Sequence, residues 1–98
     1  MKVSRKIIDK NLPKKGFVKE ESGHHIYFHH HFNGCATGVY TYISHSKKVS
    51  DYSGRLLTEV RKQLALDSNK EVVDLVNCPM TEEQYNQVLI DKGVIPAE

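Results

Sequence analysis

Residues 24–43 read HHIYFHHHFNGCATGVYTYI, and this stretch sets the architecture that we expect for the chain. Between positions 24 and 32 the side chains alternate between two faces, which is typical of a half-buried β-strand. The face expected to be buried consists of His24, Ile26, Phe28, His30 and Phe32. Asn33-Gly34 then predicts a tight turn, Gly38 is expected to close the loop, and Val39 to Ile43 has the β-branched and aromatic residues of a second strand.

The sequence before this stretch predicts a helix and a further strand. Ser4 can cap a first helix that runs to about Leu12. Lys15-Gly16 has the form of a C-terminal helix stop. Residues 17–21 are then expected to form a strand that leads into the Ser22-Gly23 turn. These three predicted strands follow one another through short turns, so we expect an antiparallel meander.

The sequence after the strands predicts helices. Asp51 or Ser53 is expected to begin the clearest one, whose apolar residues recur at helical spacing as Leu56, Leu57, Val60 and Leu64. A short helix is expected from Asn69, and another from Thr81, where Gln84 completes a capping-box pattern. The predicted fold is therefore α+β: an α-β-β-β-α unit with a three-stranded antiparallel sheet, followed by a helical extension.

The chain has 98 residues, which corresponds to one domain. Residues 1–66 carry twelve Lys and Arg against five Asp and Glu, a net charge of +7, whereas residues 67–98 carry two against seven, a net charge of −5. A basic body attracts polyanions, because it neutralises phosphates and releases their counterions. The asymmetry favours a nucleic-acid partner, with 67–98 as an acidic extension of the same domain.

Several other classes of protein are not indicated. No apolar run approaches the roughly 20 residues that a membrane span requires, and the basic start lacks the apolar core of a signal peptide. We therefore expect a cytoplasmic protein without a membrane partner. Cys35 and Cys78 are 43 residues apart without CxxC spacing, so we expect neither a disulfide framework nor a cysteine zinc site.

All six histidines fall within one window of 22 residues, 24–45. Imidazole titrates between about pH 5 and 8, so histidine is the usual residue for proton transfer or metal binding. Along a strand, residues two apart are separated by roughly 7 Å, so of the central histidines His29 and His31 could share a metal, with Cys35 as a conceivable third ligand. We expect no physiological metal site or cofactor, and we interpret His29, His30 and His31 as solvated surface residues.

Three segments of the sequence form a further pattern: Lys15-Gly16-Phe17, Ser22-Gly23-His24-His25-Ile26-Tyr27, and Ile43-Ser44-His45-Ser46-Lys47-Lys48 leading into Leu56-Leu57. In this order and spacing they resemble the HicA family of toxins, over roughly residues 4–66. The family motif is a glycine, a small hydroxyl residue and a catalytic histidine, with an aromatic residue three positions later. His24 and Tyr27 match that pattern, whereas Ser22-Gly23 has the reverse order.

The resemblance implies both a fold and an activity. HicA toxins have a double-stranded-RNA-binding-like fold, cleave messenger RNA without a metal, and are inhibited by a HicB antitoxin. It therefore implies an endoribonuclease with His24 as the catalytic acid or base, an RNA substrate and a HicB-like partner. We expect RNA contacts from the nearby cationic side chains, which are His45, Lys47, Lys48, Lys15 and Lys19.

Three alternatives stay open at this point. The reversed Ser22-Gly23 order would redirect the His24 ring, which is compatible with a catalytically inactive RNA-binding module of the same fold. His25 could take the catalytic role instead, and the acidic helices could make the chain a protein-interaction domain. Tyr40 and Tyr42 are expected on the same face of the last predicted strand, beside Tyr27 on the neighbouring strand. The three rings could stack RNA bases or pack against one another.

Overall fold

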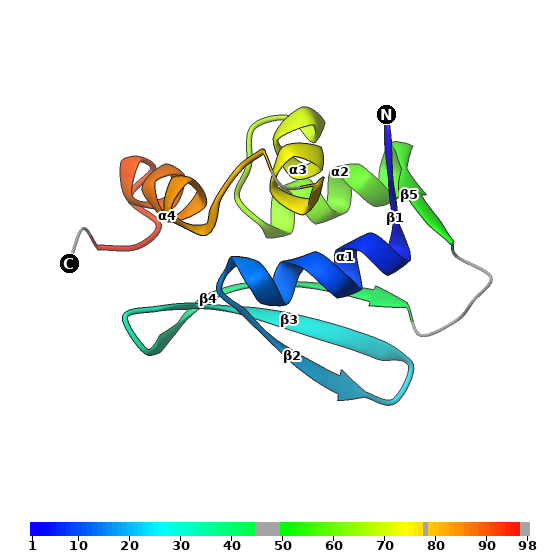
Figure 1. Ribbon diagram of the computed structural model, residues 1–98, viewed down its shortest axis with the longest axis horizontal. Helices are drawn as coiled ribbons and strands as arrows, with labels where there is room; N and C mark the ends of the chain where they lie inside the picture. The colour runs from blue at the N-terminus through cyan, green and yellow to red at the C-terminus, as the bar shows by residue number, and fades with distance from the viewer. Residues whose placement is uncertain (45–49, 78, 97–98) are drawn as a thin grey trace.

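The computed structural model describes residues 1–44, 50–77 and 79–96. In this part of the chain, a three-stranded antiparallel sheet and a two-stranded sheet combine with four α-helices in an α+β fold (Figure 1). The elements are β1 (Lys2–Ser4), α1 (Arg5–Asn11), the 3-10 helix η1 (Leu12–Lys15), β2 (Phe17–Ser22), β3 (His25–Phe32), β4 (Cys35–Ser44), β5 (Asp51–Ser53), α2 (Gly54–Gln63), α3 (Asn69–Asn77) and α4 (Glu82–Asp91).

The larger sheet has the order β2-β3-β4, as expected for a meander. Ser22 pairs with His25, so the hairpin between β2 and β3 has a two-residue turn formed by Gly23 and His24. Gly23 has a φ of 54°, and glycine adopts this left-handed conformation at the first turn position without strain. His24 was expected on the buried face of a strand, and this prediction was wrong: the turn takes His24 out of the ladder.

The second hairpin confirms the Asn33-Gly34 turn. Phe32 pairs with Cys35, and Asn33 and Gly34 have φ values of 52° and 80°, the two positive angles of a type I′ turn. The expected loop through Gly38 is wrong, because β4 already begins at Cys35. A register shift between His29 and His31 accommodates this longer strand.

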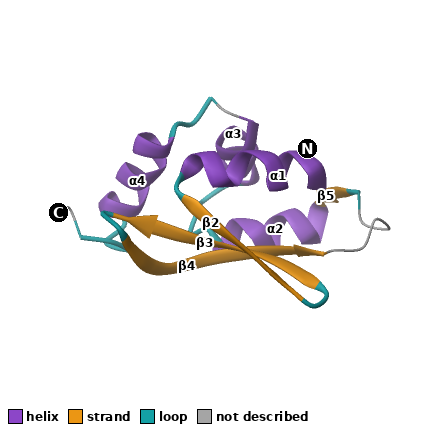
Figure 2. Ribbon diagram, turned by 60° about the horizontal axis from the view of Figure 1, so that its bottom comes forward, coloured by secondary structure: helices purple, strands orange, loops and turns teal. Residues whose placement is uncertain are grey.

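One face of the sheet is covered by helices, and the other is not covered by any described residue (Figure 2). Ile26, Phe28 and Ile43 point toward the helices and are buried. The pairing of Tyr27 with Tyr42 and of His29 with Tyr40 places those four rings together on the opposite face. The alternation that was read from the sequence is thus confirmed from Ile26 onward.

The small sheet was not predicted. Val3 of β1 lies opposite Tyr52 of β5, and both side chains are buried. The Tyr52 hydroxyl accepts a hydrogen bond of 2.9 Å from the backbone N–H of Ser44. The small sheet therefore ties the start of the chain to the end of β4 and to the beginning of α2.

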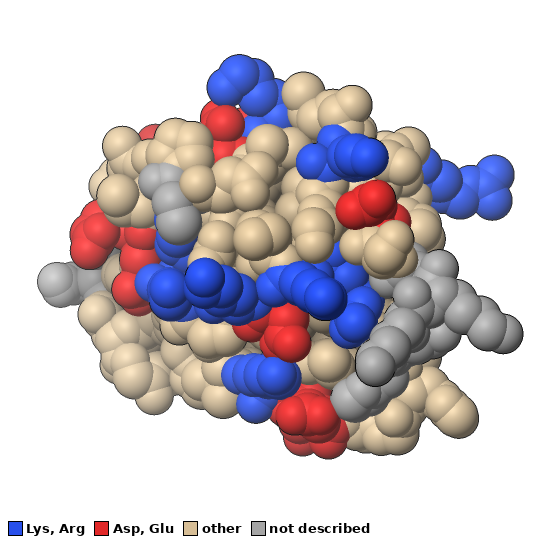
Figure 3. Space-filling view, turned by 45° about the vertical axis from the view of Figure 1, so that its right-hand side comes forward, with Lys and Arg blue, Asp and Glu red and all other residues tan. Residues whose placement is uncertain are grey.

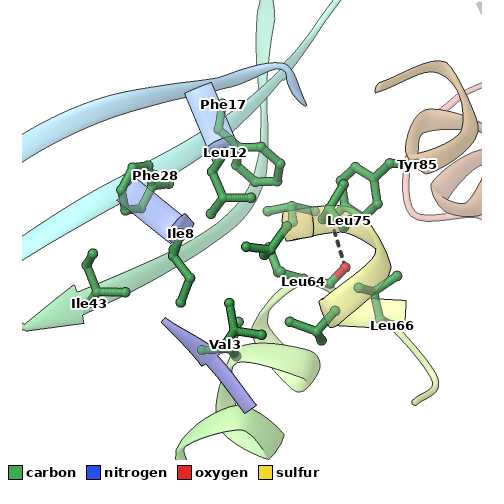
Figure 4. Packing of buried hydrophobic residues seen from close by; sticks show 14 of the residues in the cluster. Val3, Ile8, Leu12, Phe17, Phe28, Ile43, Leu64, Leu66, Leu75 and Tyr85 are labelled. Carbon is green, nitrogen blue, oxygen red and sulfur yellow. Dashed lines mark hydrogen bonds between the residues drawn. The ribbon is translucent and has the colours of Figure 1, made fainter. Parts of the chain in front are cut away.

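The helical extension shares the hydrophobic core of the body (Figure 4). Tyr85 of α4 is fully buried, packs against Phe17 with a ring separation of 5.7 Å, and donates a hydrogen bond of 2.8 Å to the Leu64 carbonyl. The other fully buried residues from this part of the chain are Val72, Leu75, Val76 and Leu89. Residues 67–96 thus complete the same core as residues 1–66.

The predicted helix signals are largely confirmed. The Ser4 side chain accepts a hydrogen bond from the Lys6 N–H at the start of α1, and Thr81 and Gln84 form both hydrogen bonds of a capping box at α4. None of the helices in the described ranges is long and apolar enough to cross a membrane.

Candidate nucleic-acid interface

His24 and His25 lie at one corner of the large sheet. The turn exposes His24 to solvent. His25 is half-buried, lies opposite Ser44 on β4, and packs edge-on against Tyr42 with a ring separation of 5.0 Å. Two consecutive histidines therefore lie at the end of the β2–β3 hairpin, and His24 is more exposed than His25.

The uncovered face of the sheet carries a continuous group of aromatic rings. Tyr27 lies 5.5 Å from Tyr42 and 6.3 Å from Tyr40, and His29 lies 5.8 Å from Tyr40 between ring centroids. These separations are those of ordinary aromatic packing. Tyr40 and Tyr42 nevertheless remain 45% and 38% exposed, so the rings that pack against one another also offer faces to a ligand.

His29 is held by an acidic neighbour across the sheet. Its Nε2 lies 2.9 Å from Glu20 Oε1 on the adjacent strand β2. Within the described residues, no three His, Cys, Asp or Glu side chains group together as metal ligands, so His29, His31 and Cys35 do not form such a set. The ring of His29 belongs instead to the aromatic face.

His30 is fully buried, and its interpretation as a solvated residue was wrong. Its Nδ1 lies 3.0 Å from Thr37 Oγ1 and its Nε2 2.8 Å from Asn86 Oδ1 of α4, while its ring packs against Phe17 and Tyr85. Burial lowers the pKa of His30 below its usual 6.5 and outweighs the opposing effect of the Asn86 hydrogen bond. This histidine is part of the core and is not accessible to a ligand.

Two lysines expected to contact RNA are engaged within the protein. Lys15 is 6% exposed, and its ammonium donates a hydrogen bond to the Met80 carbonyl. Lys19 forms ion pairs with Asp9 at 2.8 Å and Glu21 at 3.9 Å. The hydrogen bond with Asp9 raises the pKa of Lys19. Both ammonium groups are therefore occupied by partners within the protein, and neither is available as a phosphate contact in this arrangement.

A row of exposed lysines on α1 and η1 was not identified from the sequence. Lys6, Lys10 and Lys14 are all exposed and follow one another at four-residue intervals, which place side chains along one side of a helix. Figure 3 shows Lys and Arg side chains in a row across the face that carries α1. The four-residue spacing was the signal available in the sequence.

A groove of about 230 Å³ runs between the edge strand β4 and helix α2. His25 and Tyr42 contribute to it from the sheet, so it opens beside the corner described above. Its remaining lining residues are Ser44, Tyr52, Leu56, Glu59, Val60 and Gln63. The groove was not anticipated, because it depends on how far α2 lies from the sheet edge.

The predicted contacts His45, Lys47 and Lys48 lie outside the described residues. No family model, curated protein or solved structure matches this chain.

Proposed function

We propose that this protein is a HicA-like endoribonuclease that cleaves messenger RNA and uses His24 as its catalytic acid or base. The observation that carries the proposal is the exposed imidazole of His24 in a two-residue turn, directly followed by His25. Such a turn fixes the backbone position of His24 and leaves space around its side chain for a large substrate. Imidazole is the side chain that proteins use most often for proton transfer near neutral pH.

The chemistry requires two proton transfers. RNA supplies its own nucleophile, because the 2′-hydroxyl attacks the adjacent phosphorus while the bond from phosphorus to the 5′-oxygen breaks. A general base accepts the 2′-hydroxyl proton, and a general acid donates a proton to the departing 5′-oxygen. The products are a 2′,3′-cyclic phosphate and a 5′-hydroxyl. His24 performs one of these transfers, and His25, the next residue in the chain, is the candidate for the other.

The remaining parts of the site bind RNA. Lys6, Lys10 and Lys14 attract the phosphate backbone, and the exposed rings of Tyr40 and Tyr42 stack unpaired bases. His45, Lys47 and Lys48 retain their proposed role as phosphate contacts on the basis of the sequence. Lys15 and Lys19 are withdrawn from that role, because both are engaged within the protein.

The order α1-β2-β3-β4-α2 supports a double-stranded-RNA-binding-like topology, which is the topology of HicA toxins. By this resemblance the protein acts in the cytoplasm, requires no metal, and is inhibited by a HicB-like antitoxin. The two-stranded sheet and the helices α3 and α4 are additions to that common order.

The proposal is tested by incubating a long single-stranded RNA in EDTA with wild-type protein, His24→Ala and His31→Ala. His31 is half-exposed at the far end of β3, six residues from His25, so it is the matched control. We expect His24→Ala to reduce cleavage by 10² to 10⁴-fold, the usual contribution of one acid or base, with little change in RNA affinity. Wild-type and His31→Ala fragments should end in a 2′,3′-cyclic phosphate. Equal cleavage by wild type and His24→Ala would reject His24 as the catalytic residue.

A second candidate function is RNA binding without cleavage. It is favoured by the lysine row on α1, which can bind phosphates whether or not His24 acts on them. If neither wild type nor His24→Ala cleaves RNA while both are folded, and both bind RNA in a salt-dependent way, this second function replaces the first.

A further inference from the structure

We infer that the groove between β4 and α2 binds one nucleobase of the RNA substrate, with guanine as the preferred base. The inference deepens the proposed ribonuclease function and rests on it. The volume of about 230 Å³ lies below the 300–1,000 Å³ that is typical for drug-sized ligands, and it suits a single flat ring system.

The position of the groove relates it to His24. His25 lines the groove and is the next residue in the chain, so a base seated there lies beside the exposed imidazole. The nucleotide that carries this base would therefore present its phosphate at the corner of the sheet. Occupation of the groove would select which phosphate is cleaved.

The apolar walls of the groove fit the faces of a base. Tyr42 offers a ring that is 38% exposed, and Leu56 on α2 is 46% exposed although it is a large aliphatic residue. Helix α2 packs Leu57 and Val60 into the core, so Leu56 is the residue of this helix that is left uncovered at the groove. Aromatic side chains stack on unpaired RNA bases, and enzymes that flip out a base hold it between aromatic and apolar side chains.

The polar groups of the groove determine which base fits. The Thr41 hydroxyl donates a hydrogen bond of 2.6 Å to Gln63 Oε1, which orients the amide and leaves its Nε2 group as a donor. Glu59 contributes a carboxylate that accepts hydrogen bonds. Guanine matches this set best, because its N1–H and N2–H2 groups lie side by side and its O6 is an acceptor.

The charge of the groove favours a base over the RNA backbone as the occupant. Glu59 is the charged carboxylate among the described lining residues, and no described Lys or Arg lines the groove. A phosphate would be repelled there, whereas the exposed lysines on α1 provide phosphate contacts elsewhere. The groove would therefore bind a base, and the exposed lysines would bind the phosphate backbone.

The test uses the 15N-labelled full chain titrated separately with guanosine, adenosine, cytidine and uridine. We expect guanosine to shift the amide signals of Tyr42, Leu56 and Glu59 at the lowest concentration. Glu59→Gln should raise the apparent Kd for guanosine at least fivefold, because the amide replaces one of two acceptors with a donor. Glu83→Gln changes an exposed glutamate near the start of α4 and should leave the Kd unchanged.

The outcomes separate this inference from the proposed ribonuclease activity. Guanosine shifts in the groove support the inference even if RNA is not cleaved, whereas cleavage with no shift in the groove overturns the inference and leaves the ribonuclease intact. The same Kd for Glu59→Gln and Glu83→Gln would also overturn it. Groove signals that move with protein concentration alone would assign the groove to a second copy of the chain, which contradicts the inference.

Discussion

The His30 Nε2 atom lies 2.8 Å from Asn86 Oδ1, and this hydrogen bond joins the central strand of the sheet to α4. Since Asn86 offers an oxygen, Nε2 carries the proton and donates it. The ring is fully buried between Phe17 and Tyr85, an environment in which a charged imidazole would be costly. We therefore expect His30 to make the stability of the whole fold sensitive to pH.

We expect the free energy of unfolding to fall as the pH decreases below about 6.5. The pKa of His30 is lowered in the folded state, so in this range the unfolded chain binds a proton that the folded chain does not bind. The decrease should reach at most about 1.4 kcal/mol per pH unit and should end once the folded state is also protonated. Urea denaturation at pH 7.5, 6.5 and 5.5 measures this decrease in the free energy of unfolding.

His30→Gln is the control for this pH dependence, because an amide can donate to Asn86 but does not titrate. Its stability should change less between pH 7.5 and 5.5 than that of wild type. Parallel pH profiles for the two proteins would show that His30 is not the responsible group.

Lys14 and Lys15 are neighbours with opposite expected roles. Lys15→Met removes the ammonium that is bonded to the Met80 carbonyl, and it should lower the free energy of unfolding by about 1.5 to 3 kcal/mol with little effect on RNA affinity. Lys14→Met alters an exposed residue, so it should weaken RNA binding and change stability by less than about 0.5 kcal/mol. Urea denaturation and RNA titration of both variants check this, and equal losses of RNA affinity would contradict the separation.

The lysine row on α1 and η1 should govern the salt dependence of RNA binding. Each neutralised phosphate contributes about −0.7 to the slope of log affinity against log salt for a single strand. Replacing Lys6, Lys10 and Lys14 with Gln should therefore make the slope less negative by about 2. Lys70→Gln on α3 is the control, because its ammonium is paired with Asp74. An unchanged slope in the triple variant would place the phosphate contacts elsewhere.

Tyr85→Phe should lower the free energy of unfolding by about 1 to 3 kcal/mol, because the buried Leu64 carbonyl would lose its hydrogen bond. Tyr40→Phe is the matched control: Tyr40 is 45% exposed, and the change should cost less than about 0.5 kcal/mol. Urea denaturation of both variants provides the comparison. A similar, small effect for both would show that the hydroxyl of Tyr85 is not required.

Local signals predicted much of the fold. The Ser4 cap, the Asn33-Gly34 turn and the Thr81–Gln84 capping box depend on neighbouring residues, and each lies where the sequence placed it. The β1–β5 sheet was missed because strands of three residues have no measurable alternation and their pairing joins distant parts of the chain. The position predicted for His24 was wrong because the alternation of buried and exposed side chains along β3 was extended to His24, which belongs to the turn.

The surroundings of the candidate site were harder to predict from the sequence, because they depend on tertiary contacts. Alternation did place His30 beside Ile26 and Phe28 on the buried face, and composition alone led to its interpretation as a surface residue. The burial of Lys15 depends on Met80, which is 65 residues away, and no local pattern carries that information. The role of His24 stays a prediction that the cleavage assay will decide.

The packing of α4 also has a consequence for how the chain is made. The β2-β3-β4 hairpins pair residues close in sequence, so they can form early during synthesis, whereas Tyr85 and Leu89 leave the ribosome much later. Until then, Phe17 and the neighbouring inner face of the sheet lack part of their cover. We therefore expect the nascent protein to pass through an interval in which this apolar surface is accessible to chaperones or prone to aggregation.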